Sequence, residues 1–183
     1  MYEVFESSRR TNSEAVLREL AGKKVLSDEA WRAGAIWSSQ NKYDSVYPTV
    51  DCAIFDGDND IWMGRKSYED KLRFIGGFVS PSDKSFEAAA EREAKEETGL
   101  DCKVSNYVTS QLVDDWRYKN ESDKIMTTLY AMNVVSGEPK ANDDIEDIYR
   151  VNLTKLSAND VVEEHKPLLK ALQEWKSLPT KKK

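Results

Sequence analysis

The chain has 183 residues, of which 39% are apolar, 33% charged and 10% aromatic, and its formal net charge is −6. This size and balance are typical of one globular domain with a full core. The acidic balance argues against nucleic acid as a main partner, because phosphate backbones are bound by basic surfaces. No apolar run is long enough to cross a membrane, and the N-terminus lacks the basic start and apolar core of a signal peptide. We therefore expect a cytoplasmic location.

Residues 1–45 are predicted to form a helical arm that is partly separate from the rest of the chain. One helix is expected over residues 13–20 and another from Ser27 onward, each after polar residues that favour helix N-termini. Trp31 and Trp37 lie six residues apart, so they do not share one helical stripe. These tryptophans could anchor the arm to the body of the protein or to a second copy in a homodimer.

The pattern changes to strands after the arm. Residues 46–55 are rich in β-forming side chains and end at residues 56–60, which have the Asp, Gly and Asn composition of a turn. An extended run resumes at residues 61–63. This order predicts a β-hairpin.

The middle of the chain combines a loop, a helix and two strands. Residues 74–81 are expected to form a glycine-containing loop, and residues 85–98 have the composition of a strong helix. Strands are predicted over residues 104–113 and 125–135, joined by the polar stretch 114–124.

The C-terminal part adds a last strand over residues 147–153 and an amphipathic helix over residues 161–175. Residues 46–176 should then form one α/β domain, in which a mixed sheet lies between helices. The basic tail at residues 177–183 is expected to fray.

Three glutamates give the predicted central helix an unusual face. Glu93, Glu96 and Glu97 stand at positions i, i+3 and i+4, so their side chains lie together. Like charges at this spacing oppose the helix by roughly 0.2–0.5 kcal/mol each. A hard divalent cation would remove the repulsion, because such ions prefer oxygen ligands. Taken alone, the three glutamates are equally compatible with a solvated acidic face.

Glycines flank this helix on both sides. Gly99 is placed to end it in the left-handed conformation, with an apolar residue after it. Gly76 and Gly77 would let the backbone approach a ligand or metal, since a side chain there would obstruct it. These features favour a binding site over a plain acidic surface.

Seven positions of this segment follow a fixed order. They are Gly77, Arg92, Glu93, Glu96, Glu97, Gly99 and the apolar Leu100. Each residue type has a chance frequency of roughly one in ten to one in twenty, so coincidence of all seven is remote. The order resembles the Nudix box, G-x5-E-x7-R-E-apolar-x-E-E-x-G-apolar, and residues 92–100 match its second half completely.

The resemblance implies an α/β/α sandwich and metal-dependent hydrolysis of a nucleoside diphosphate linked to another group, with Mg²⁺ or Mn²⁺ as cofactor. By this analogy Glu93 and Glu97 are the principal metal ligands, and Glu96 is a ligand or a base that orients water. Arg92 would hold a box carboxylate in position, and the carbonyl of Gly76 could add a metal ligand.

The first half of the box departs from the pattern. Counted back from Arg92, the usual glutamate position holds Lys84; counted forward from Gly77, it holds Asp83. The loop is one residue longer than the pattern, so the acid is displaced to Asp83 or lost. Lys84 could contact a substrate phosphate, Asp83 could turn toward the metals, or both could face solvent.

A weaker similarity extends over residues 46–172. The lengthened glycine loop, residues 124–128 and residues 143–146 resemble Nudix domains associated with nicotinamide-mononucleotide adenylyltransferases. The resemblance implies ADP-ribose as the leading substrate. Alternatives are another nucleotide, such as a nucleoside triphosphate, NADH or a dinucleoside polyphosphate, and a non-catalytic sensor that binds ADP-ribose.

Other side chains are candidates for the site. Asp144 and Glu146, in an acidic stretch before the last strand, could add a metal ligand or a base, or could form an exposed turn. Trp116 and Tyr118 could stack on a base, or could serve packing. Arg73, just before the glycine pair, is a phosphate contact or an ordinary surface residue.

His165 is the only histidine of the chain. It lies in a charged stretch with no motif around it, so no Ser-His-Asp or Cys-His set can be built from the sequence. Packing or helix capping is the expected role.

Overall fold

The computed structural model describes residue 34, residues 44–115 and residues 123–178. The chain divides into two compact units, residues 1–45 and 46–183. The predicted helices of the arm, its two tryptophans and the C-terminal end of the basic tail lie outside the described residues, and the homodimer stays a prediction. None of the described helices is long and apolar enough to span a membrane.

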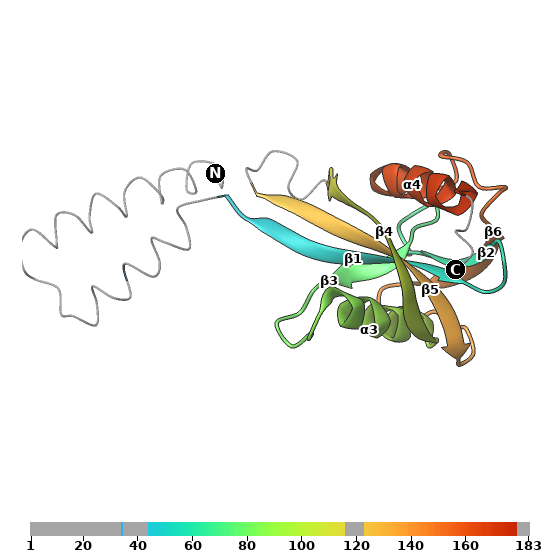
Figure 1. Ribbon diagram of the computed structural model, residues 1–183, viewed down its shortest axis with the longest axis horizontal. Coiled ribbons are helices and arrows are strands. Elements are labelled where there is room, and N and C mark those ends of the chain that lie inside the picture. Colours follow the sequence, from blue (N-terminus) through green and yellow to red (C-terminus); the bar gives the residue numbers. More distant parts are fainter. Residues whose placement is uncertain (1–33, 35–43, 116–122, 179–183) are drawn as a thin grey trace, which may run out of the picture. The chain divides into compact units, whose positions relative to one another are not determined.

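One mixed sheet forms the centre of the second unit (Figure 1). Its strands are β1 (Val46–Phe55), β2 (Asp60–Arg65), β3 (Ile75–Phe78), β4 (Asp101–Val113), β5 (Lys124–Ser136) and β6 (Asp147–Asn152). The spatial order is β4-β5-β1-β2-β6, with β3 paired to β1. β1 runs parallel to β5 along its whole length, and its other edge pairs antiparallel first with β3 and then with β2. The predicted hairpin of β1 and β2 is confirmed.

Two helices cover opposite faces of this sheet, α3 (Phe86–Thr98) and α4 (Lys166–Ser177) (Figure 1). Alternate residues of β1 divide between the two layers, as the two-residue repeat of a strand requires. Val50, Cys52 and Ile54 pack with the alanines of α3. Ala53 and Phe55 belong to the core beneath the leucines of α4. The predicted α/β/α sandwich is therefore confirmed.

Local signals set both ends of α3. The Ser85 side chain accepts a hydrogen bond from the backbone N–H of Ala88 at 3.1 Å, which caps the N-terminus. Gly99 adopts φ 71° and its N–H donates to the carbonyl of Lys95, so it ends the helix in the left-handed conformation. The helix that carries the acidic face is confirmed, together with its glycine terminator.

Two predicted elements differ most from the structure, one in type and one in its start. Residues 75–78, expected in a loop, form strand β3, because their backbone pairs with residues 49–52 of β1. The C-terminal helix begins at Lys166 instead of residue 161, after a short 3-10 turn, Glu163–His165. Pro167 explains this start, because proline lacks an N–H and is tolerated only in the first turn of a helix.

Candidate active site

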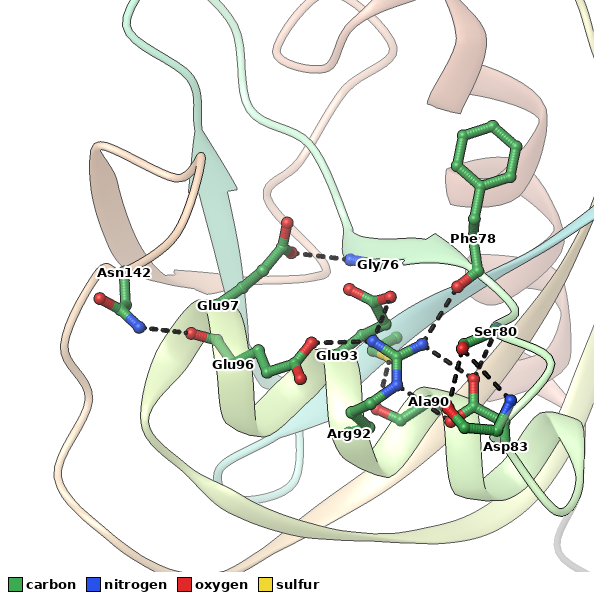
Figure 2. Close-up of polar contacts among 12 residues, drawn as sticks. Gly76, Phe78, Ser80, Asp83, Ala90, Arg92, Glu93, Glu96, Glu97 and Asn142 are labelled. Carbon is green, nitrogen blue, oxygen red and sulfur yellow. Dashed lines mark hydrogen bonds and ion pairs between the residues drawn. The ribbon is translucent and has the colours of Figure 1, made fainter.

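Glu93 and Glu97 lie one turn apart on the face of α3 that meets β3. Both residues are buried and both line a cavity of about 260 Å³. The N–H of Gly76 donates to Glu97 Oε2 at 2.9 Å, which fixes that carboxylate against the start of β3 (Figure 2). The i, i+4 spacing therefore brings two carboxylates to one wall of the cavity.

Burial makes the charged forms of these acids costly. It raises the pKa of Glu93, although the Arg92 guanidinium opposes the shift. Burial, with the neighbouring carboxyl of Asp144, raises the pKa of Glu97 to about 8, against the lowering by the Gly76 N–H. Two buried carboxylates with raised pKa values form a site that favours added positive charge.

Arg92 connects the two halves of the motif (Figure 2). Its Nη1 donates to Glu93 Oε1 at 2.7 Å and to Glu96 Oε2 at 2.8 Å. Its Nε and Nη2 donate to the two oxygens of Asp83 at 3.0 and 2.9 Å, and Nη2 also donates to the carbonyl of Phe78 at 3.1 Å. The guanidinium beside Asp83 lowers the pKa of that carboxyl. Asp83 therefore neither turns toward the cavity nor simply faces solvent, because Arg92 holds both of its oxygens.

The two glycines before α3 leave room for specific neighbours. A Cβ on Gly76 would lie 2.1 Å from the carbonyl oxygen of Val50, so the pairing of β3 with β1 requires glycine there. A Cβ on Gly77 would lie 2.8 Å from the carboxylate of Glu93. Both glycines line the cavity. Gly77 thus makes space for a carboxylate of this chain.

The loop before β6 brings a further acid to the cavity. The N–H of Asn142 donates to the carbonyl of Glu97 at 3.1 Å, and its side chain donates to the carbonyl of Glu96 at 3.0 Å. This anchor on the last turn of α3 places Asp144 beside Glu97, where it also forms an ion pair with Lys66. Asp144 and Lys66 both line the cavity.

Two cationic side chains line the same cavity. Lys66 and Arg73 line the cavity and also line a second, adjoining one of about 460 Å³. Arg73 forms an ion pair with Glu69. A cavity lined by carboxylates together with Lys and Arg suits a phosphorylated ligand in the presence of a cation, because the cationic side chains can contact phosphate oxygens directly.

Several predicted site residues are not brought to the cavity. Glu96 is half-exposed and lies against Arg92. Glu146 and Lys84 are exposed, and neither lines the cavity. Trp116 and Tyr118 lie outside the described residues. This placement gives no support for Lys84 as a phosphate contact or for Glu146 as a ligand.

Lys66, Asp51 and His165 line the cavity but were not predicted as site residues. Asp51 is the one charged residue of β1 and lies in its buried half, which is a signal, because a charged residue is rarely buried without a specific partner. Lys66 and His165 carry no such local signal, since only the fold brings them to the cavity.

A divalent cation fits this donor set. Mg²⁺ is typically bound by one or two carboxylates together with substrate phosphates, and here Glu93 and Glu97 are two buried carboxylates in need of positive charge. Within the described ranges, no three Asp, Glu, His or Cys side chains converge as a ready-made metal site. Glu93 and Glu97 would therefore hold such a cation together with backbone or substrate oxygens.

Solved structures with the same fold come from several organisms. An ADP-ribose pyrophosphatase from Streptococcus suis is 21% identical with a TM-score of 0.53, over 69% of this chain and 87% of its own. A MutT protein from Methanosarcina mazei is 17% identical with a TM-score of 0.60, over 74% and 98%. A bifunctional NMN adenylyltransferase/ADP ribose pyrophosphatase from Francisella tularensis, complexed with AMP and a Mn ion, is 19% identical with a TM-score of 0.56, over 78% and 45%.

These likenesses show the fold. A search of curated proteins found no match. The sequence profile of the NUDIX domain matches residues 45–172, which include the whole sheet, α3 and most of α4. The chain therefore belongs to the Nudix domain family.

Proposed function

We propose that this Nudix protein hydrolyses the pyrophosphate bond of a nucleoside diphosphate derivative in the presence of Mg²⁺ or Mn²⁺, with ADP-ribose as the leading substrate. One observation carries the proposal: the buried carboxylates of Glu93 and Glu97 face a cavity that Lys66 and Arg73 also line. Solved structures with this fold include proteins described as ADP-ribose pyrophosphatases, and they support the choice of substrate.

Each group at the cavity has a distinct role in this proposal. Glu93 and Glu97 hold the cation, and Arg92 keeps the Glu93 carboxylate in place. The bound cation would neutralise the diphosphate and lower the pKa of water. Lys66 and Arg73 contact phosphate oxygens, which orients the bond to be broken.

A carboxylate at the cavity accepts the proton of the attacking water. Asp144 suits this role better than Glu96, because Asp144 lines the cavity whereas the half-exposed Glu96 lies against Arg92. Attack of the resulting hydroxide on one phosphorus of ADP-ribose would yield AMP and ribose 5-phosphate.

The substrate assignment is tested by a comparison of kcat/KM for ADP-ribose, NADH, a dinucleoside polyphosphate and 8-oxo-dGTP under identical Mg²⁺. We expect ADP-ribose to be preferred at least tenfold over the triphosphate, with AMP as one product. A tenfold preference for the triphosphate would overturn the substrate assignment. Absence of hydrolysis for all four, with tight binding of ADP-ribose, would favour the sensor alternative instead.

A further inference from the structure

Asp51 is a buried acid that the proposed reaction does not use. It lies on β1, on the same face as Ala53 and Phe55, toward α4. The hydroxyl of Thr127, on the adjacent β5, donates to Asp51 Oδ2 at 2.5 Å. The second oxygen, Oδ1, points toward His165, whose Nε2 lies 3.6 Å away, beyond hydrogen-bond length.

His165 is held in one orientation at the start of α4. Its Nδ1 accepts a hydrogen bond from the backbone N–H of Phe74 at 2.9 Å, and its ring stacks on Phe74 with centroids 5.7 Å apart. Because Nδ1 accepts, the proton of the neutral ring sits on Nε2. Burial lowers the pKa of His165, which favours this neutral form. Nε2 is then a donor directed toward the acceptor Asp51 Oδ1.

Both side chains line the cavity that contains Glu93 and Glu97. The two glutamates reach it from the layer of α3, whereas Asp51 and His165 reach it from the layer of α4. The lining also includes the apolar Val113 and Ile125, so the cavity is not formed by the metal-binding glutamates alone. A substrate whose diphosphate lies at Glu93 and Glu97 would place its non-reacting half toward Asp51 and His165.

The donor His165 Nε2 and the acceptor Asp51 Oδ1 lie 3.6 Å apart, so a ligand group between them would have to accept one hydrogen bond and donate another. A hydroxyl donates its hydrogen to a carboxylate oxygen and accepts from an N–H with a lone pair. We propose that Asp51 and His165 bind a sugar hydroxyl on the non-reacting half of the substrate and thereby select sugar-bearing nucleoside diphosphates. This inference rests on the proposed function, because it uses the same cavity and the same substrate class.

The unaltered protein provides the first test. Binding of ADP-ribose and of analogues that each lack one sugar hydroxyl is measured by calorimetry with Ca²⁺ in place of Mg²⁺. We expect removal of one particular hydroxyl to weaken binding about 30-fold or more, because it leaves the buried carboxylate and N–H unpaired. If every analogue binds within threefold of ADP-ribose, or if ADP-ribose does not bind at all, the inference is overturned.

Variants show whether Asp51 and His165 carry that selectivity. Asp51→Asn removes the charge, and His165→Asn removes the Nε2 donor while keeping an acceptor for the Phe74 N–H. In each variant, the Kd of ADP-ribose and the Kd of the analogue that lacks the critical hydroxyl should agree within threefold. Asp60→Asn is the matched control, because Asp60 also lies in a strand but does not line the cavity. This variant should bind ADP-ribose in preference to the deoxy analogue as strongly as the wild type does.

Loss of affinity for all ligands alike, in variants that still melt cooperatively, would show that the pair only holds α4 to the sheet and would contradict the inference. If a variant fails to fold, the analogue series on the unaltered protein still decides. Hydroxyl-dependent binding without hydrolysis in Mg²⁺ would defeat the proposed function alone. Hydrolysis of ADP-ribose and of every deoxy analogue with the same kcat/KM would defeat this inference alone.

Discussion

The helix α3 and the loop before it carry the two halves of one sequence motif, and they tolerate change differently. The helix half keeps the family spacing, and its glutamates Glu93 and Glu97 share one wall of the cavity. The loop half has one additional residue, yet Asp83 still reaches Arg92 with both carboxylate oxygens. An irregular loop can absorb an insertion if its acid still reaches its partner. A helix cannot, because each inserted residue rotates all later side chains by about 100°.

The largest effect is expected on the helix side. Glu97→Gln and Glu93→Gln should each lower kcat about a hundredfold or more, because glutamine keeps the shape and helix propensity but removes a charge that the cation requires. Glu91→Gln is the control: it lies on the same helix, pairs with Lys103 and does not line the cavity. Full activity of both cavity variants in steady-state kinetics would refute the metal role of α3.

A smaller effect is expected on the loop side. Asp83→Asn should lower kcat about tenfold, because Arg92 would hold the Glu93 carboxylate less firmly. An effect of this size is typical of a residue that positions a metal ligand through another side chain. The Mg²⁺ concentration for half-maximal rate should stay nearly unchanged, and Asp83→Glu should recover part of the loss. A raised Mg²⁺ requirement with an unchanged kcat would instead mean that Asp83 acts at the cation.

Glu97, on the helix side, should also make the stability of the metal-free protein depend on pH. The pKa of Glu97 is raised from 4.5 to about 8 in the folded protein, so between these pH values the folded state binds more protons than the unfolded state. This group therefore lowers the free energy of unfolding as pH rises from 4.5 to 8. Glu97→Gln should remove that loss, which is at most about 4–5 kcal/mol near pH 8, in urea unfolding with a chelator. An equal pH slope in variant and wild type would contradict the assignment.

The smallest effect is expected at Lys84. This exposed residue does not line the cavity, so Lys84→Ala should change KM less than twofold. Lys66→Ala should raise KM about tenfold, because Lys66 lines the cavity and is proposed to contact phosphate. A fivefold rise of KM in Lys84→Ala, measured beside Lys66→Ala, would place Lys84 at the substrate after all.

The sequence predicted the parts of the site that are local in the chain. Helical spacing places Glu93 and Glu97 together, and the glycine terminator follows from composition. Strand β3 was missed because four residues with two glycines show no alternation, and pairing with β1 makes them a strand.

Contacts between residues far apart in the chain were predicted only in part: Asp144 was a candidate for the site, whereas Asp51 and His165 were not. Asp51 and His165 are 114 positions apart and meet only because β1 and the start of α4 pack together. Asp144 reaches Glu97 through the anchor of Asn142 on α3. Tertiary packing decides which distant residues meet, and a single sequence does not identify these partners.

The central claim, that the helix carboxylates rather than the loop acid bind the divalent cation, is tested most directly by Mn²⁺ affinity. Free Mn²⁺ can be measured by electron paramagnetic resonance during titration of wild type, Glu97→Gln and Asp83→Asn. We predict that Glu97→Gln raises the Kd for Mn²⁺ about tenfold or more, because it removes a carboxylate ligand. Asp83→Asn should change this Kd less than threefold. Equal weakening by both substitutions, or by Asp83→Asn alone, would contradict the claim.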